Sequence, residues 1–196
     1  MLIKGSESGV EIEADDNLHD VIDFSLSGST LKLATLKDVL SAKKLIVKIT
    51  YTSDFKNVIA KNESQVTSLS DIELDDISFK SYDYAKLFLN TKNTSFNLEC
   101  YDKSKAELNL KSEKIKISLS KNASIKAVIH ANEMTFDLYQ KSDATVEGDV
   151  VNFKLRMDNN ATFTGKNLAA LNGIITTEGY TNASVNVKTA ITIDAA

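Results

Sequence analysis

The densest group of chemically versatile side chains in this sequence is a short acidic segment, residues 71–76. Carboxylates gathered in this way could bind Ca²⁺, or act as acid and base in the cleavage of a glycosidic bond. Their alternation with apolar residues is also typical of the solvent-facing side of a β-strand. We favour the solvated strand and keep a glycan-active enzyme as the alternative hypothesis. The carboxylates of the segment are Asp71, Glu73, Asp75 and Asp76.

Tyrosines form the second group of candidates, because they recur at matching places of an internal repeat, close to its small-residue motif. Aromatic rings on an extended β-surface are suited to stacking on sugars or to contact with a protein partner. We therefore predict that they form a binding face for a glycan or for a host or cell-surface protein. The predicted binding residues are Tyr82, Tyr84, Tyr101, Tyr139 and Tyr180.

Other kinds of chemistry find little support in the composition. The chain has 196 residues and a net charge of −4, which argues against nucleic-acid binding. Arg156 is its single arginine, so a phosphate clamp built from several guanidinium groups is excluded. Cys100 is its single cysteine, which excludes an internal disulfide and a multi-cysteine zinc site. We predict neither a metal nor a cofactor, no catalytic residue, and no membrane span, since no stretch approaches about 20 apolar residues.

The elements that would position these side chains follow from an internal repeat. Its unit is a small polar residue, Ala, a hydroxyl residue and a large apolar residue. Anchors of the unit, some of them weaker copies, fall at positions 64, 85, 106, 123, 144, 161 and 183. The clearest copies begin with the pairs Asn122-Ala123, Asp143-Ala144, Asn160-Ala161 and Asn182-Ala183.

Between the anchors the apolar residues alternate with period two, as in Ile115-x-Ile117-x-Leu119. That pattern favours strands over a helical solenoid. We predict an all-β fold, a parallel β-helix or β-solenoid of about seven coils of 17–22 residues. An antiparallel sandwich is the alternative, but it does not explain anchors that recur in one frame.

The polar-Ala pairs are predicted to be the corners of the coils. Ala would fit where stacked chains leave little room, and Asn or Asp tolerates the left-handed backbone of a tight turn. Asn122, Asp143, Asn160 and Asn182 would then form a ladder along one edge. The anchor spacings of 21, 21, 17, 21, 17 and 22 residues predict loops that bulge in alternate coils.

The first 44 residues do not fit the repeat. Apolar alternation around a turn at Ser27-Gly28-Ser29 predicts a hairpin, and residues 35–44 predict a short helix. We therefore expect an N-terminal β-hairpin cap region at 1–44 and solenoid repeats at 45–196. The sequence stops one strand into a further coil, so we expect the natural protein to continue. It also starts without a leader, so we expect export to depend on a segment absent from this chain.

The repeated polar-Ala-Ser/Thr-apolar unit resembles the head GIN domain family of autotransporter-adhesin-like proteins. Asn122-Ala123-Ser124-Ile125 and Asn182-Ala183-Ser184-Val185 resemble the family's repeat, and the turn from Gly28 to Leu33 resembles a turn of its N-terminal β-region. The family more often has Gly before the Ala, where this chain has Asn or Asp. The resemblance covers residues 9–196 and implies a β-helical fold exported by Gram-negative bacteria to the periplasm, outer membrane or cell surface. It supplies no catalytic residue.

These observations together predict a non-enzymatic, exported β-solenoid that acts as an adhesin-like binding or structural module. The repeat, the lack of a catalytic motif and the family resemblance all favour this hypothesis. The alternative is the glycan-active β-helix enzyme that would use the acidic segment 71–76.

Overall fold

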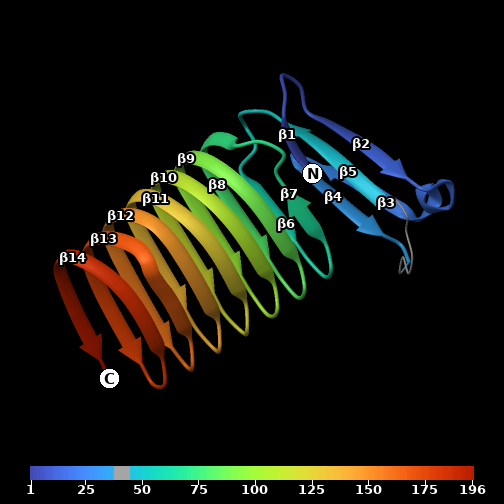
Figure 1. The fold of residues 1–196 in the computed structure, drawn as a ribbon. Helices are drawn as coiled ribbons and strands as arrows, with labels where there is room; N and C mark the ends of the chain where they lie inside the picture. The colour runs from blue at the N-terminus through green and yellow to red at the C-terminus, as the bar shows by residue number, and fades with distance from the viewer. Residues whose placement is uncertain (38–44) are drawn as a thin grey trace. The chain divides into compact units, whose positions relative to one another are not determined.

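The computed structural model describes residues 1–37 and 45–196, which form two compact units, Met1–Thr52 and Ser53–Ala196. Apart from a 3-10 turn, η1 (Asp16–Val21), every described element is a β-strand (Figure 1). The all-β prediction is therefore confirmed. No helix in the described residues is long and apolar enough to cross a bilayer.

The N-terminal unit holds two small sheets. One has the strand order β1 (Leu2–Lys4), β5 (Leu45–Tyr51), β2 (Gly9–Ala14), with β1 parallel and β2 antiparallel to β5. The other is the hairpin of β3 (Ile22–Ser27) and β4 (Thr30–Thr35).

The predicted hairpin is present, since Ser27 pairs with Thr30 and Gly28 has the positive φ of 58° that its turn requires. The division between the two units lies between Thr52 and Ser53, so β5 belongs to the first unit, whereas the sequence frame began the repeats at residue 45. Most of the helix predicted at 35–44 lies outside the described residues, and Thr35 itself ends β4.

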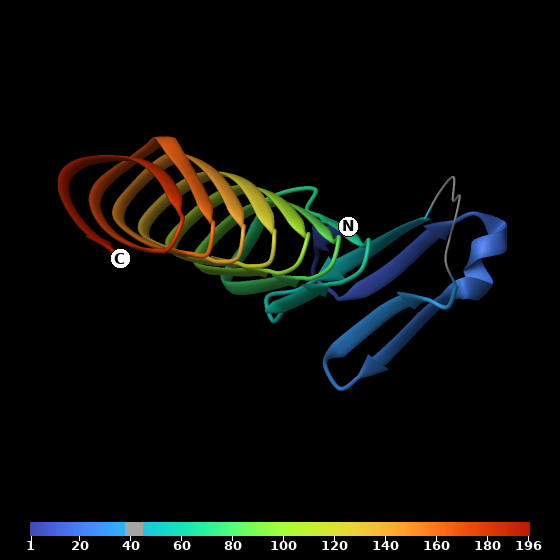
Figure 2. The same cartoon turned by 90° about the horizontal axis from the view of Figure 1, so that it is seen from below.

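The second unit is a parallel β-solenoid, and its axis runs across the strands (Figures 1 and 2). Short strands begin it, and from β9 onward each coil is one long, bent strand. Neighbouring strands follow the order β14-β13-β12-β11-β10-β9-β8-β6, and β7 pairs with β9. The bounds are β6 (Asn57–Ala60), β7 (Gln65–Thr67), β8 (Ile72–Ser81), β9 (Lys86–Cys100), β10 (Lys105–Leu119), β11 (Ser124–Leu138), β12 (Asp143–Asp158), β13 (Thr162–Glu178) and β14 (Asn182–Ala195).

The coils have nearly constant length. Lys86, Lys105, Ser124, Asp143 and Thr162 are successive register partners, so each step is 19 residues, and the step to Asn182 is 20. The predicted alternation of 17 and 21 residues is wrong, and so are the bulging loops in alternate coils. Because strand side chains repeat every two residues, a frame shifted by two still has its apolar residues inward.

The coils are joined by tight corners, the segments 82–85, 101–104, 120–123, 139–142 and 158–161. In the corner 120–123 the amide of Ala123 donates to the carbonyl of Ser120, and Lys121 and Asn122 both have positive φ. This is the backbone of a type I′ turn. The second corner residue has positive φ in every coil, in the column Asn62, Asp83, Asp102, Lys121, Gln140, Asn159 and Gly179.

Two of the four predicted corners are displaced. Asn122-Ala123 and Asn160-Ala161 lie at corners, but Asp143 begins β12 and Asn182 begins β14. Ala144 and Ala183 therefore lie inside strands, and the predicted ladder of Asn and Asp does not form. The last residue of the corner is small and buried whether it is Ala or Ser, as in Ala85, Ser104, Ala123, Ser142 and Ala161.

Ala144 belongs instead to an interior column in which large and small side chains alternate from coil to coil. This alternation lets each large residue fill space over its small neighbours at close packing. Phe163 uses the space beside Ala144, with its ring centroid 5.4 Å from that of Phe136 and 5.2 Å from that of Phe153. The column runs through Leu87, Ala106, Ile125, Ala144 and Phe163.

Each long strand also bends near its middle, at the segments 93–95, 112–114, 131–133, 150–152 and 170–172. There two successive side chains point outward, as Glu113 and Lys114 do, and the inward phase shifts by one residue. Unlike the corners, these segments contain none of the positive-φ residues of the described chain. The bend divides every coil into two flat halves.

Candidate functional site

The acidic segment lies on the outside of the solenoid. Glu73, Asp75 and Asp76 are exposed residues of β8, alternating with the buried Ile72 and Leu74. Glu73 is the register partner of Lys92 on the next coil. Within residues 1–37 and 45–196, no cluster of His, Cys, Asp and Glu has the makings of a metal site. The arrangement is that of an outward strand face.

Three of the predicted tyrosines share one column, at the first residue of the corner. Tyr82 and Tyr101 stack with ring centroids 5.0 Å apart and planes 9° from parallel. The ammonium of Lys61 lies 5.5 Å from the Tyr82 centroid, on the preceding coil. Tyr139 lies two coils further along and is covered by the guanidinium of Arg156 at 5.4 Å. Much of the aromatic surface of this column is therefore already engaged within the chain.

The other two tyrosines lie at the third residue of the corner. The Tyr84 ring has the ammonium of Lys103 at 5.3 Å from its centroid, and that ammonium donates to the phenol oxygen at 3.3 Å. Tyr180 is 88% exposed, and its ring extends into solvent. The structure thus places the five tyrosines in two adjacent corner columns, and Tyr180 presents the most open ring.

A polar network fixes the Tyr101 side chain. Its hydroxyl donates to Glu99 Oε2 at 2.8 Å, and Lys80 Nζ lies 3.1 Å from the same oxygen. The hydrogen bond to Glu99, helped by burial and the carboxylate charge, raises the pKa of Tyr101 to about 12. Burial alone would raise the pKa of Glu99, but hydrogen bonds from Tyr101 and Lys80 outweigh it and lower that pKa.

Cys100 is buried with its side chain inside the solenoid, as predicted for a small apolar residue. Burial raises the pKa of its thiol to about 11. Its register partner is Leu119, rather than Ile117 as the sequence frame implied. The thiol is therefore a packing group, held protonated at neutral pH.

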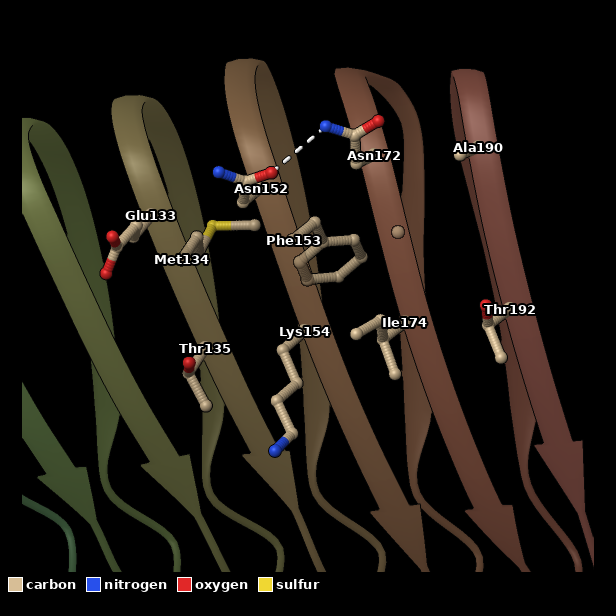
Figure 3. A pocket seen from close by; sticks show the side chains of 11 residues that line it. Glu133, Met134, Thr135, Asn152, Phe153, Lys154, Asn172, Ile174, Ala190 and Thr192 are labelled. Atoms are coloured by element: carbon tan, nitrogen blue, oxygen red, sulfur yellow. Dashed lines mark hydrogen bonds between the residues drawn. The ribbon is translucent and has the colours of Figure 1, made fainter.

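A hollow of about 410 Å³ lies over the bend and the following half-coil of β11 to β14 (Figure 3). Its volume falls within the range of about 300–1,000 Å³ that is usual for small-ligand sites. Across the hollow the Asn172 amide donates to Asn152 Oδ1 at 3.0 Å, and the two side chains span adjacent coils. The lining residues are Glu133, Met134, Thr135, Asn152, Phe153, Lys154, Asn172, Gly173, Ile174, Ala190 and Thr192.

The lining combines groups of different chemistry. Asn152, Asn172 and the threonines supply neutral donors and acceptors, and Ile174 supplies an apolar surface that is 52% exposed. Glu133 is the one carboxylate among the lining residues, and its Oε2 lies 3.7 Å from Lys114 Nζ. A surface of this kind matches a ligand rich in hydroxyl groups with an apolar face.

Sequence reasoning missed this hollow. Its residues come from four coils and meet only when the coils stack in the correct register, which the frame displaced by two residues did not supply. Gly173 was a usable signal, since it occupies an interior column otherwise filled by Ile115, Met134 and Phe153. A missing side chain in such a column indicates a change in local packing.

Comparison with known proteins agrees with this architecture. A crystal structure of a putative adhesin from Parabacteroides distasonis shares 17% identity and a TM-score of 0.63, over 98% of this chain and 87% of that one. Another putative adhesin, from Parabacteroides merdae, shares 17% identity and a TM-score of 0.55, over 100% and 87%. These likenesses concern the fold. None of the curated proteins matches the sequence.

The family comparison covers the whole sequence. Residues 1–196 match the family described as "Putative auto-transporter adhesin, head GIN domain". This match agrees with the resemblance drawn from the repeat motif. The chain therefore belongs to the head GIN domain family.

Proposed function

We propose that this protein is an exported, non-enzymatic, adhesin-like module that binds a neutral glycan in the hollow over β11 to β14. The observation that carries the proposal is the hydrogen-bonded amide pair of Asn152 and Asn172 beside the exposed Ile174. Side-chain amides donate and accept at once, as sugar hydroxyls do, and an apolar side chain suits the C–H face of a sugar ring.

The charges of the hollow support a neutral ligand. Glu133 and Lys154 contribute one charge of each sign, and Glu133 is further balanced by Lys114. A strongly anionic or cationic ligand would therefore meet a like charge as well as an opposite one. The regular outer surface of the solenoid supports the same interpretation, because adjacent coils repeat their side chains at about 4.8 Å.

The number of carboxylates favours binding over turnover. Glycoside hydrolysis usually employs two carboxyl groups on either side of the scissile bond. The lining of the hollow provides Glu133 alone, and the acidic residues 71–76 lie on β8 and just before it, several coils away. The enzyme hypothesis would have to rest on that exposed segment.

A glycan array followed by titration calorimetry tests the proposal. We expect at least one neutral glycan to bind, and the Asn152→Ala/Asn172→Ala variant to bind it at least tenfold more weakly. Asn97→Ala is the matched control, since Asn97 also donates across coils, to Ser78 Oγ at 3.1 Å, but on β9. Its affinity should change less than twofold.

Other outcomes would overturn the proposal. If Tyr101→Ala or Tyr180→Ala removes binding and the double amide variant does not, the tyrosine columns are the binding face. If the folded protein ignores every glycan, the glycan hypothesis fails. Release of reducing ends that disappears in Asp75→Asn would favour the enzyme.

Export is part of the proposal and is tested separately. The family match supports a location outside the cytoplasm. Proteinase treatment of intact source cells, with antibody detection of this domain, should remove the signal if the domain is displayed at the surface. Protection in intact cells together with release on osmotic shock would place it in the periplasm, and retention in spheroplast lysates would contradict export.

A further inference from the structure

The interior of the solenoid contains a group of polar side chains near the bend of β9 and β10. Thr91 and Ser112 are 3% and 7% exposed, and Asn93 lies between them in the same inward region. Within the described part of the chain, Thr91 Oγ1, Asn93 Oδ1 and Ser112 Oγ are buried and make no hydrogen bond. Buried oxygens without a partner are rare in native interiors and call for an explanation.

The register brings these three residues together. Asn93 of β9 and Ser112 of β10 are direct register partners on adjacent coils. Thr91 precedes Asn93 by two residues, so its side chain lies on the same inward face. The three oxygens therefore share one corner of the interior, whose remaining neighbours are mostly apolar.

The orientation of the Asn93 amide is fixed by the preceding strand. Its nitrogen donates to the carbonyl oxygens of Ile72 at 3.2 Å and Leu74 at 2.7 Å. Both amide hydrogens are thus used on the β8 side, and these two acceptors determine which atom of the amide is nitrogen. Oδ1 is left to accept a hydrogen bond inside the solenoid.

We propose that Thr91, Asn93 and Ser112 form a binding site for one internal water molecule. Side chains on adjacent parallel strands start about 4.8 Å apart, too far for a direct hydrogen bond between short side chains. A water with two bonds of about 2.8 Å joins oxygens about 4.5–5.5 Å apart. Such a water donates to Asn93 Oδ1 and exchanges hydrogen bonds with the two hydroxyls, which meets the usual requirement of two to four polar partners.

The neighbouring residues leave room for the water and favour it over a cation. The inward column at this point runs from Leu74 through Asn93 and Ser112 to Ala131, so the side chains become smaller where the water would lie. The three oxygens are neutral, whereas Ca²⁺ and Mg²⁺ take six or more oxygen ligands that usually include carboxylates. The ligand that fits the group is therefore water.

Water-to-protein cross-relaxation in ¹⁵N-labelled protein tests the proposal. The side-chain amide protons of Asn93 should show a cross-peak to a long-lived water, with the sign of slow tumbling. Thr91→Val keeps the shape of the side chain and removes the hydroxyl, and it should lower the cross-peak by at least half. Ser112→Ala should do the same. Ser142→Ala is the matched control, because Ser142 Oγ is also buried without a partner but lies at a corner of the described chain, and it should leave the peak unchanged.

The measurement on the unmodified protein already decides the matter, so the proposal does not depend on the folding of a variant. Absence of a water cross-peak at Asn93 in the folded protein would overturn it. A cross-peak that survives Thr91→Val combined with Ser112→Ala would also overturn it. A crystal structure with a metal-like distance near 2.3 Å to these oxygens would replace the water by a cation.

Discussion

The tight corner and the bend of each coil both turn the chain, but they do so by different means. At the corner the backbone does the work, with a positive φ at the second residue of every coil and a buried Ala or Ser at the fourth. At the bend the turn comes from two successive outward side chains without left-handed residues. The corner is therefore constrained in backbone and volume, and the bend is constrained in neither.

This difference has a functional meaning. The inward bend column contains residues as different as Leu74, Asn93, Ser112 and Val150, and the outward bend residues form part of the hollow. A place whose geometry accepts many side chains is where a repeat fold can acquire a site without loss of stability. The predictions below test the comparison by placing the same change at a corner and at a bend.

The largest effect is expected from enlarging an interior alanine in β11 or the corner before it. Ala123→Leu at the corner should lower the free energy of unfolding by about 3 kcal/mol, because its neighbours in the column are equally confined. Ala131→Leu at the bend should cost about 1 kcal/mol, because its column already accepts Leu74 and Val150. Urea denaturation measures both, and equal losses would contradict the distinction between corner and bend.

A smaller effect is expected from the left-handed residues. Asn122 has φ of 67°, so Asn122→Ala should lower the free energy of unfolding by about 1 kcal/mol. Asn122→Gly should leave it unchanged or raise it slightly. Asn132→Ala at the exposed bend should stay within about 0.5 kcal/mol. A loss from Asn132→Ala as large as that from Asn122→Ala would remove the backbone argument.

The smallest effect concerns the pH dependence of the corner tyrosines. Since the pKa of Tyr101 is raised to about 12 in the folded state, the stability it contributes is complete below its ordinary pKa near 10 and is lost as pH rises toward 12. Absorbance at 295 nm should show a late phenolate step that Tyr101→Phe removes. Glu99→Gln should move this step to lower pH, and a late step that persists in both variants would assign it elsewhere.

The sequence was sufficient for the fold class and for the inward alternation, because period-two apolar runs such as Ile115, Ile117 and Leu119 are buried as expected. It was insufficient for the register. Ala106 and Ala144 resemble corner residues in type, whereas the corner positions are held by Ser104 and Ser142, two residues earlier. Both sets face inward, so only the requirement of constant coil length distinguishes them.

The candidate tyrosines illustrate the second limit. Their recurrence at the corner could be recognised from the repeat, but the stacking of Tyr82 on Tyr101 and the cover of Arg156 on Tyr139 depend on neighbours in other coils. The same holds for Asn152 and Asn172, which are 20 residues apart and meet only across the strand spacing. Contacts between coils are determined by register, and an error of two residues in register changes every one of them.

The constant step of 19 residues has a consequence for how such a chain changes over time. Duplication or deletion of one whole coil keeps every inward and outward column aligned, and it alters the solenoid axis by one strand spacing of about 4.8 Å. An insertion of any other length would shift the columns on its two sides out of alignment. The coil is thus a unit of measurement, and the separation of two surface features on different coils is heritable in whole steps of that unit.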